Sequence, residues 1–421
     1  KLFYIDERGE GRDKVYSTVF LKDTILNKLQ SNPVAQQMLQ FGNNIGNLFP
    51  NEEALCMASA FMQDKQTRIV VKKNRYEAQQ LYQRLKPLIN DTLLFVMEES
   101  LRVQAIASSP EDKQEQLYVL TQLVKEDKPR IIICNTAAFL RYLPDKELFK
   151  SLCFKFEVDQ EITMTELKQK LNRAGYTKVN YVDRPCTYAS RGGIVDVYCL
   201  EYEHPIRIEF FDTVIESIRL FHEETQRTIE TVDSVLINPA TDLLFTDDQI
   251  EYLQKEIDSE LEKQQAKLIQ DDYDFLLDYI EKDKISIENY DIDPHLYIYF
   301  SYLKANKLTD YVKGHIIFSS QEEVENGYKK LNEETISFIQ EMVESHQYLP
   351  KYSMYHDLFT FKNEYNIQMF HDFLDFKNPI FSKIETLEKS DQPLIQILEN
   401  LKGENIYISL DEEHTKKVEE A

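Results

Sequence analysis

The chain has 421 residues, and its hydrophobic content of 42% is enough for more than one core, which predicts two to four domains. Only 10 residues are glycine, which argues against glycine-rich phosphate-binding loops in any number. The formal net charge of −24 is uneven: about +2 for residues 1–150, −5 for 151–240 and −21 for 241–421. Because negative charge repels a phosphate backbone, the last part is not expected to contact nucleic acid.

The first predicted domain, residues 23–148, alternates between helical and strand patterns after an unplaced segment, residues 1–22. Helices are predicted at 23–41 with a break at Pro33, and at 51–62, 74–89 and 110–126. Short apolar strands are predicted at 67–71, 92–97 and 130–135. Strand–helix–strand alternation with uniformly apolar strands indicates an α/β fold with a mainly parallel sheet between helices.

The second predicted domain, residues 149–239, has a different pattern. A helix is predicted at 163–176, and it stops at Gly175. Strands are predicted within 181–200, 204–212, 214–229 and 231–238. In these segments apolar and polar residues alternate, which is typical of a sheet with one solvated face. We expect a small antiparallel α+β domain.

The third predicted domain, residues 240–386, is mostly helical, acidic and rich in tyrosine, with one strand-like segment at 314–320. Its charge indicates either a solvated acidic surface or a face for a basic partner or another domain. Residues 387–421 have a helix–strand–helix pattern and are expected to begin a further α/β domain. The overall expectation is a multidomain protein of α/β and α+β class.

The cysteine pattern and the hydropathy indicate a reduced, cytoplasmic protein. Five cysteines occur, an odd number without CxxC spacing: Cys56, Cys134, Cys153, Cys186 and Cys199. Neither a zinc site nor any other metal site is expected, and the eight histidines have no paired ligand spacing. No apolar run approaches the ~20 residues of a membrane span, and no hydrophobic signal core opens the chain.

No catalytic motif is recognisable in the sequence. A phosphate-binding loop would precede the helix at 51–62, where the sequence FGNNIGNLFPNEEALC has neither a lysine nor a Gly-Lys-Ser/Thr motif. Glu52 and Glu53 would repel a phosphate at this helix N-terminus. No acidic pair follows the strand RIIIC, where Asn135 stands instead. We therefore predict no catalytic residue and no bound cofactor in this chain.

Two arginines and one phenylalanine are the candidate site residues. Arg191 precedes Gly192-Gly193, which permit a bulge or an unusual φ. Arg207 and Phe211 share one strand parity, which predicts that both are exposed on the same face. Exposed phenylalanine and arginine are typical of protein-binding hot spots. The alternative is pairing within the domain, for example of Arg207 with Glu209 and its neighbours across the sheet.

The segment YASRGGIVDVYCLEYEHPIRIEFFDTVIESIRLFHEETQRTIETVDSV resembles the N-terminal module of the bacterial transcription-repair coupling factors, the Mfd family. That module is itself similar to the excision-repair protein UvrB. The match is specific over residues 160–240 and looser over residues 22–150 and 240–385. One departure is Cys186-Thr187, where relatives often have Gly-Glu.

The resemblance implies that the small α+β domain docks UvrA through Arg191, Arg207 and Phe211. It also implies that the flanking regions are a degenerate helicase-like domain of the RecA-like, P-loop type and a helical UvrB-like partner domain. The family's ATP- and magnesium-dependent motor, which translocates on double-stranded DNA, and its RNA-polymerase-binding part would lie outside this chain.

The expected function is therefore that of a non-catalytic adaptor that recruits UvrA in nucleotide excision repair. Two alternatives remain at this point. One is a UvrB-like, DNA-dependent ATPase that binds damage itself, which needs a Gly-Lys-Ser/Thr loop and an aromatic β-hairpin. The other is a scaffold that docks a different partner through the same sheet. No membrane contact is expected.

Overall fold

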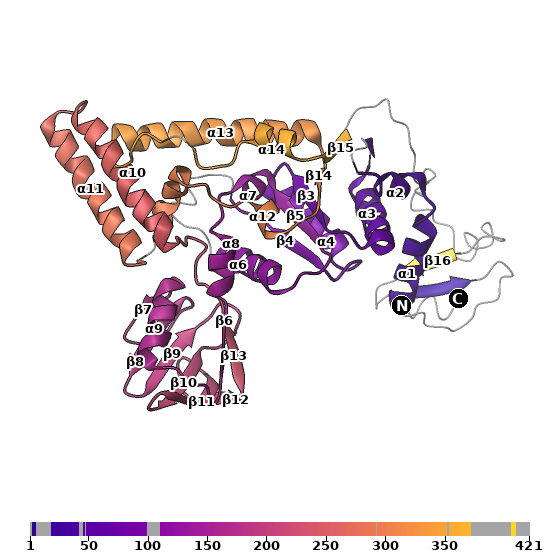
Figure 1. Ribbon diagram of the computed structural model, residues 1–421. Coiled ribbons are helices and arrows are strands. Elements are labelled where there is room, and N and C mark those ends of the chain that lie inside the picture. Colours follow the sequence, from indigo (N-terminus) through magenta and orange to yellow (C-terminus); the bar gives the residue numbers. More distant parts are fainter. Residues whose placement is uncertain are drawn as a thin grey trace, which may run out of the picture. The chain divides into compact units, whose positions relative to one another are not determined.

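The computed structural model forms two compact units (Figure 1). It describes residues 2–5, 18–41, 45–46, 48–98, 110–291, 293–351, 353–371 and 406–409. The first unit comprises Lys1–Gln40, Gly46–Asp64 and Phe373–Ala421, and the second comprises Phe41–Ile45 and Lys65–Asp372. The predicted α/β and α+β class agrees with this mixture of parallel sheets, antiparallel sheets and helices.

The described residues of the first unit form three helices and a two-stranded antiparallel sheet. The helices are α1 (Thr18–Leu29), α2 (Pro33–Gln37) and α3 (Pro50–Asp64). The predicted break at Pro33 is confirmed, because Asn32 caps α2 and proline fits the first turn of a helix. Strand β1 (Leu2–Ile5) pairs with β16 (Ile406–Ser409), so a strand from the predicted final domain pairs with the first residues of the chain. The rest of residues 387–421 lies outside the described residues.

Strands β15, β14, β3, β5 and β4 of the second unit belong to a six-stranded sheet of order β2-β15-β14-β3-β5-β4. Its strands are β2 (Ile45–Gly46), β3 (Arg68–Lys72), β4 (Thr92–Phe95), β5 (Ile131–Asn135), β14 (His315–Phe318) and β15 (Ile367–His371). The pairs from β15 through to β4 are all parallel, as the apolar strands predicted. Helices α4 (Arg75–Leu85), α6 (Pro110–Lys125) and α7 (Thr136–Leu140) connect or follow these strands.

Strand β14 pairs with strands that lie far from it in the sequence. The sequence places this strand as an isolated segment inside a mostly helical region, residues 240–386. In the structure β14 lies between β15 and β3, so it belongs to the sheet of the first α/β region. A strand of four apolar residues does not specify its neighbours, because parallel pairing joins segments that are far apart in the chain.

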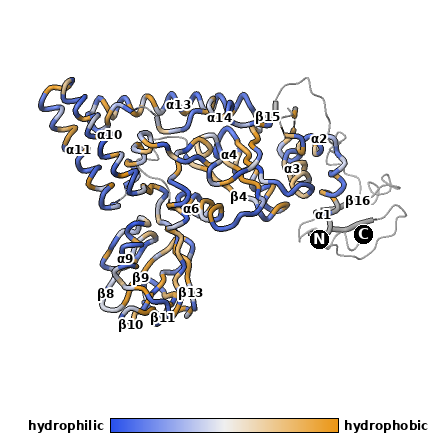
Figure 2. The backbone as a smooth tube through the Cα atoms, viewed as in Figure 1, coloured by the Kyte–Doolittle hydropathy of each residue, from blue (hydrophilic) through white to orange (hydrophobic). Residues whose placement is uncertain are grey.

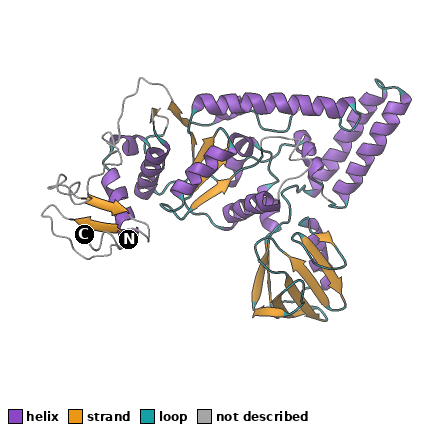
Figure 3. Cartoon of the chain, turned by 180° about the vertical axis from the view of Figure 1, so that it is seen from behind, coloured by secondary structure: helices purple, strands orange, loops and turns teal. Residues whose placement is uncertain are grey.

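The α+β region follows, with α8 (Lys146–Ser151) and α9 (Met164–Arg173) as its helices. Its main sheet has the order β12-β11-β10-β9-β8-β7. Figure 3 draws the strands of this region in orange. The strands are β7 (Thr177–Lys178), β8 (Thr187–Arg191), β9 (Ile194–Tyr198), β10 (Ile206–Phe211), β11 (Val214–Phe221) and β12 (Thr228–Val232). Only the β7–β8 pair is parallel, and the remaining pairs are antiparallel as predicted. A separate pair joins β6 (Phe154–Glu157), which the sequence analysis did not identify, to β13 (Ser234–Ile237).

Two positive φ angles explain sequence features of this region. Gly175 follows α9 with a φ of 83°, so it ends the helix as predicted. Cys186 has a φ of 63° immediately before β8 begins at Thr187. This left-handed conformation favours glycine, which is the residue the resemblance leads us to expect at position 186. The departure at Cys186-Thr187 therefore leaves the strand intact.

The remaining elements of the second unit are mainly helical. They are α10 (Asp247–Gln265), α11 (Gln270–Glu288), the 3-10 helix η1 (Pro294–Tyr302), α12 (Leu308–Tyr311), α13 (Gln321–Glu344) and α14 (Leu358–Glu364). In Figure 2 hydrophobic and hydrophilic residues alternate along α10, α11 and α13, as expected of amphipathic helices. None of the helices in the described part of the chain is long and apolar enough to cross a membrane.

A partly buried charge pair between α11 and η1 predicts a pH dependence of stability. His295 contacts Asp283 at 2.7 Å and Asp293 at 2.8 Å, and the hydroxyl of Tyr299 donates to Asp283 at 2.6 Å. Burial lowers the pKa of His295, but the hydrogen bonds to both carboxylates outweigh this effect and raise the pKa to about 9. The pair therefore stabilises the fold fully below pH ~6.5, the ordinary pKa of histidine.

We expect the free energy of unfolding to fall by roughly 2 kcal/mol as the pH rises from 6.5 to 9, because over this window folded His295 still binds a proton that the unfolded chain has lost. Urea denaturation at several pH values measures this loss. The His295→Gln variant is the control, and its stability should be nearly independent of pH across the same window. An equal decline in this variant would contradict the assignment to His295.

Candidate functional site

The main sheet of the α+β region has one apolar face and one polar face. The apolar face is formed by Tyr188, Val195, Val197, Ile206, Ile208, Ile215 and Ile218, all of which are buried. The hydroxyl of Tyr188 donates to Asn172 of α9 at 2.7 Å, which places α9 against this face. Period-2 alternation then puts Arg207, Glu209 and Phe211 on the opposite, polar face.

The glycine pair forms the turn between β8 and β9. Gly192 has a φ of 56° and is the first residue of a two-residue hairpin loop, where a positive φ suits the twist of the strands. A side chain on Gly193 would approach the carbonyl oxygen of Phe210 to 3.0 Å. The predicted unusual φ is therefore confirmed, whereas the β8–β9 pairing contains no bulge at this point. The hairpin brings Arg191 to the polar face.

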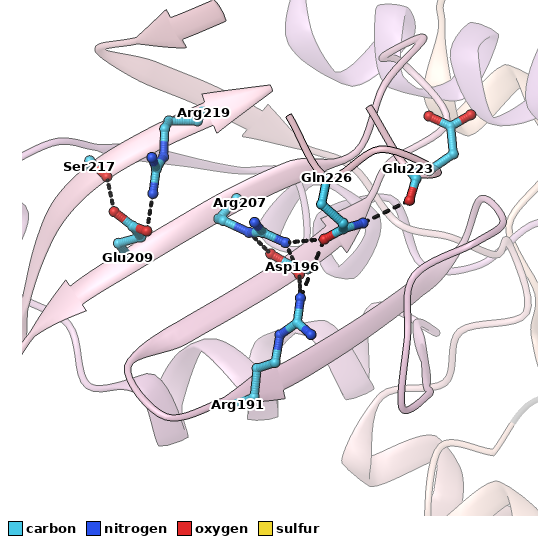
Figure 4. A network of polar contacts seen from close by, with 8 residues as sticks. All are labelled: Arg191, Asp196, Arg207, Glu209, Ser217, Arg219, Glu223 and Gln226. Carbon is cyan, nitrogen blue, oxygen red and sulfur yellow. Dashed lines mark hydrogen bonds and ion pairs between the residues drawn. The ribbon is translucent and has the colours of Figure 1, made fainter. Parts of the chain in front are cut away.

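Arg207 and Asp196 form the centre of a polar network on this face (Figure 4). They are direct partners across β10 and β9, and the guanidinium donates to both carboxylate oxygens at 2.7 and 2.8 Å. Arg207 also donates to the side-chain oxygen of Gln226 at 2.7 Å and lies over the ring of Phe221 at 4.2 Å. The side chain of Asp196 is only 4% exposed, so Arg207 is the main group that compensates this buried carboxylate.

Arg191 joins the same network from the end of β8. Its guanidinium donates to Asp196 and to Gln226, each at 3.4 Å, which is long for a hydrogen bond. Its side chain remains 51% exposed. Gln226 lies in the β11–β12 loop with a φ of 58°, and its amide nitrogen donates to the backbone oxygen of Glu223 at 2.7 Å. This loop therefore holds Gln226 in place between the two arginines.

Phe211 lies at the other end of the polar face. It is the last residue of β10 and is 73% exposed, the most exposed phenylalanine of the α+β region. It lies four positions after Arg207, a distance of about 13 Å along a strand. Between them Glu209 accepts from Ser217 at 2.8 Å and forms an ion pair with Arg219. The structure therefore places Phe211 on the predicted face but away from the arginine network.

The prediction that Arg207 is exposed is wrong, because its side chain is only 14% exposed. Arg207 does pair within the domain, but its partner is Asp196 and not Glu209. Sequence reasoning assigned no role to Asp196 or Gln226. A signal for Asp196 existed, since an aspartate between two buried valines of a strand needs a positive partner, and Arg207 follows in the next strand.

Ligands bind at the carboxyl edge of the parallel sheet in open α/β folds, so charged residues at this edge are candidates for a second site. Lys73 follows β3 and pairs with Glu77 at 2.8 Å and with Glu323 of α13, and these hydrogen bonds raise the pKa of Lys73. In the first unit, taken by itself, the carboxylate of Glu52 at the N-terminus of α3 accepts the backbone N–H of Phe49 at 3.0 Å. These charged groups are engaged by the chain itself. Within the described ranges no cluster of three metal-ligating side chains occurs.

The polar network, the RG hairpin and the helix-backed sheet define a recognisable kind of domain. Residues 154–243, which contain β6 through β13, match the family model of the UvrB interaction domain. This part of the chain is therefore similar to that family, and the predicted resemblance of the α+β region is confirmed.

Similarity to known proteins extends beyond this domain. The chain is 32% identical over 282 residues to the transcription-repair-coupling factor of Bacillus subtilis (strain 168), which is 65% of this chain and 24% of that protein. It is 28% identical over 305 residues to the factor of Staphylococcus haemolyticus (strain JCSC1435), or 71% of this chain and 26% of that protein. The chain spans about a quarter of the length of these curated relatives. Its resemblance to the Mfd family is thus confirmed.

Proposed function

We propose that this chain is a non-catalytic docking module that binds UvrA through the polar face of its UvrB interaction domain. The observation that carries the proposal is the convergence of Arg191 and Arg207 on one buried carboxylate, with exposed Phe211 on the same face. A partly exposed arginine and an exposed aromatic ring are among the side chains that dominate protein interfaces. The domain family and the relatives support UvrA as the partner.

The structure also supports different roles for the two arginines. Arg207 is nearly buried and tied to Asp196 by two short hydrogen bonds, so its principal role is to hold the network together. Arg191 has only long contacts and is half exposed, so its guanidinium is available to a carboxylate on the partner. Phe211 supplies apolar area at the far end of the face.

In this proposal the chain brings UvrA to DNA damage at which RNA polymerase has stalled, as part of a longer coupling factor. Contacts with RNA polymerase and double-stranded DNA, and the use of ATP and magnesium, would belong to other parts of that protein. The competing function, a UvrB-like ATPase, is disfavoured by the carboxylate of Glu52 at the N-terminus of α3 and by the ion pairs of Lys73.

Titration of purified UvrA into the chain tests the proposal, with Arg191→Ala as the main variant. We expect this variant to bind at least about sixfold more weakly, which corresponds to a loss of about 1 kcal/mol. Arg184→Ala is the matched control, because Arg184 is an exposed arginine of the same domain that is not part of the network. Equal affinity of Arg191→Ala and the control would contradict a docking role for this face.

A further inference from the structure

Tyr181 is an exposed aromatic residue beside the arginine network. It lies in the loop between β7 and β8, and 48% of it is exposed. The next residue, Val182, is buried, and the N–H of Val179 donates to the backbone oxygen of Tyr188 in β8 at 2.9 Å. The backbone of the loop is therefore anchored on both sides of Tyr181.

The ring of Tyr181 contacts the docking arginine directly. The guanidinium carbon of Arg191 lies 5.3 Å from the centre of the ring, within the range of a cation–π interaction. Tyr181 also contributes to the raised pKa of Arg207, for which the hydrogen bond to Asp196 is the largest cause. The phenol therefore lies near both arginines of the network.

Apart from this ring contact, the guanidinium of Arg191 is held among the described residues only by long hydrogen bonds. Its hydrogen bonds to Asp196 and Gln226 are both 3.4 Å long, and they restrain the guanidinium weakly. A long side chain that is free in the unbound protein loses rotamer entropy when a partner fixes it. An aromatic face that holds the planar guanidinium before binding reduces this loss.

We propose that Tyr181 is a further anchor of the docking surface, which orders Arg191 and offers the exposed part of its ring to the same protein partner. This inference rests on the proposed function, because it concerns the same partner and the same face. It extends the surface beyond the three residues named from the sequence, towards the β7–β8 edge of the sheet. The composition of the extended surface, with two exposed aromatic rings and an arginine, is that of an interface hot spot.

The test compares the affinity for UvrA of Tyr181→Ala, Tyr181→Leu and Tyr181→Phe. We expect about fivefold weaker binding for the alanine and leucine variants, since both remove the aromatic face, and nearly unchanged binding for the phenylalanine variant. Tyr252→Ala is the matched control, because Tyr252 is a similarly exposed tyrosine on α10. Thermal unfolding of each variant shows whether the fold is retained.

A double-mutant cycle adds a measurement that a purely structural role would not change. If Tyr181 acts through Arg191, the Tyr181→Ala substitution should weaken binding less in the Arg191→Ala background than in the wild type. Wild-type affinity of Tyr181→Leu, or full additivity in the cycle, would overturn the proposed support of Arg191. If Tyr181→Ala binds normally while Arg191→Ala and Phe211→Ala do not, this inference fails and the proposed function stands. If the wild-type chain itself does not bind UvrA, both fail.

Discussion

Replacing Arg207 with alanine is expected to lower the free energy of unfolding by about 3 kcal/mol. The substitution leaves the buried carboxylate of Asp196 with one long contact to Arg191, and an uncompensated buried charge is strongly destabilising. It also removes the cation above the ring of Phe221. Urea denaturation of the two proteins, with the slope of the transition checked for two-state behaviour, measures the difference.

The Asp196→Ala/Arg207→Ala double variant separates the cost of the orphaned charge from the loss of packing. With both partners removed, no charge is left buried, and we expect the double variant to be more stable than Arg207→Ala alone. The opposite order would mean that Asp196 does not depend on Arg207. A loss of UvrA binding in Arg207→Ala must be judged together with this stability, because such a loss alone would not show direct contact.

Phe211→Ala is expected to weaken UvrA binding by about 2 kcal/mol, or roughly 30-fold, without a comparable effect on the fold. The ring is 73% exposed, so removing it leaves no cavity, and we expect the free energy of unfolding to change by less than about 0.5 kcal/mol. Calorimetric titration with UvrA measures the first effect, and urea denaturation measures the second.

The control for this prediction is Phe275→Ala on α11, where a phenylalanine is also exposed but lies on a helix outside the UvrB interaction domain. This variant should bind UvrA as the wild type does. If Phe211→Ala bound equally well, the far end of the polar face would not be part of the interface. A similar loss in both variants would indicate a non-specific effect of removing exposed aromatic rings.

Local patterns predicted the sheet and the placement of Phe211 correctly. Strand alternation is a property of consecutive residues, so the sequence of β10 from Ile206 to Phe211 is enough to predict which of its side chains lie on the polar face. The helix start at Asn74 and the helix stop at Gly175 were equally local, since a cap and a left-handed glycine need no distant partner.

The burial of Arg207 could not be predicted in this way. It depends on Asp196 in the neighbouring strand and on Gln226 in a loop 19 residues later in the chain. Both residues belong to the segment that resembles the Mfd family, but a resemblance does not show which side chains touch. The position of β14 between β3 and β15 also could not be predicted, because a short apolar strand does not specify which strands it joins.

The central claim is that the folded chain itself binds UvrA through a charged face. Titration of purified UvrA into the wild-type chain at low and high salt tests it most directly. The account predicts a dissociation constant of about 1 μM or below at low salt, and weaker binding at high salt because ions screen the half-exposed Arg191. No binding by the folded wild-type chain, or an affinity that does not depend on salt, would contradict it.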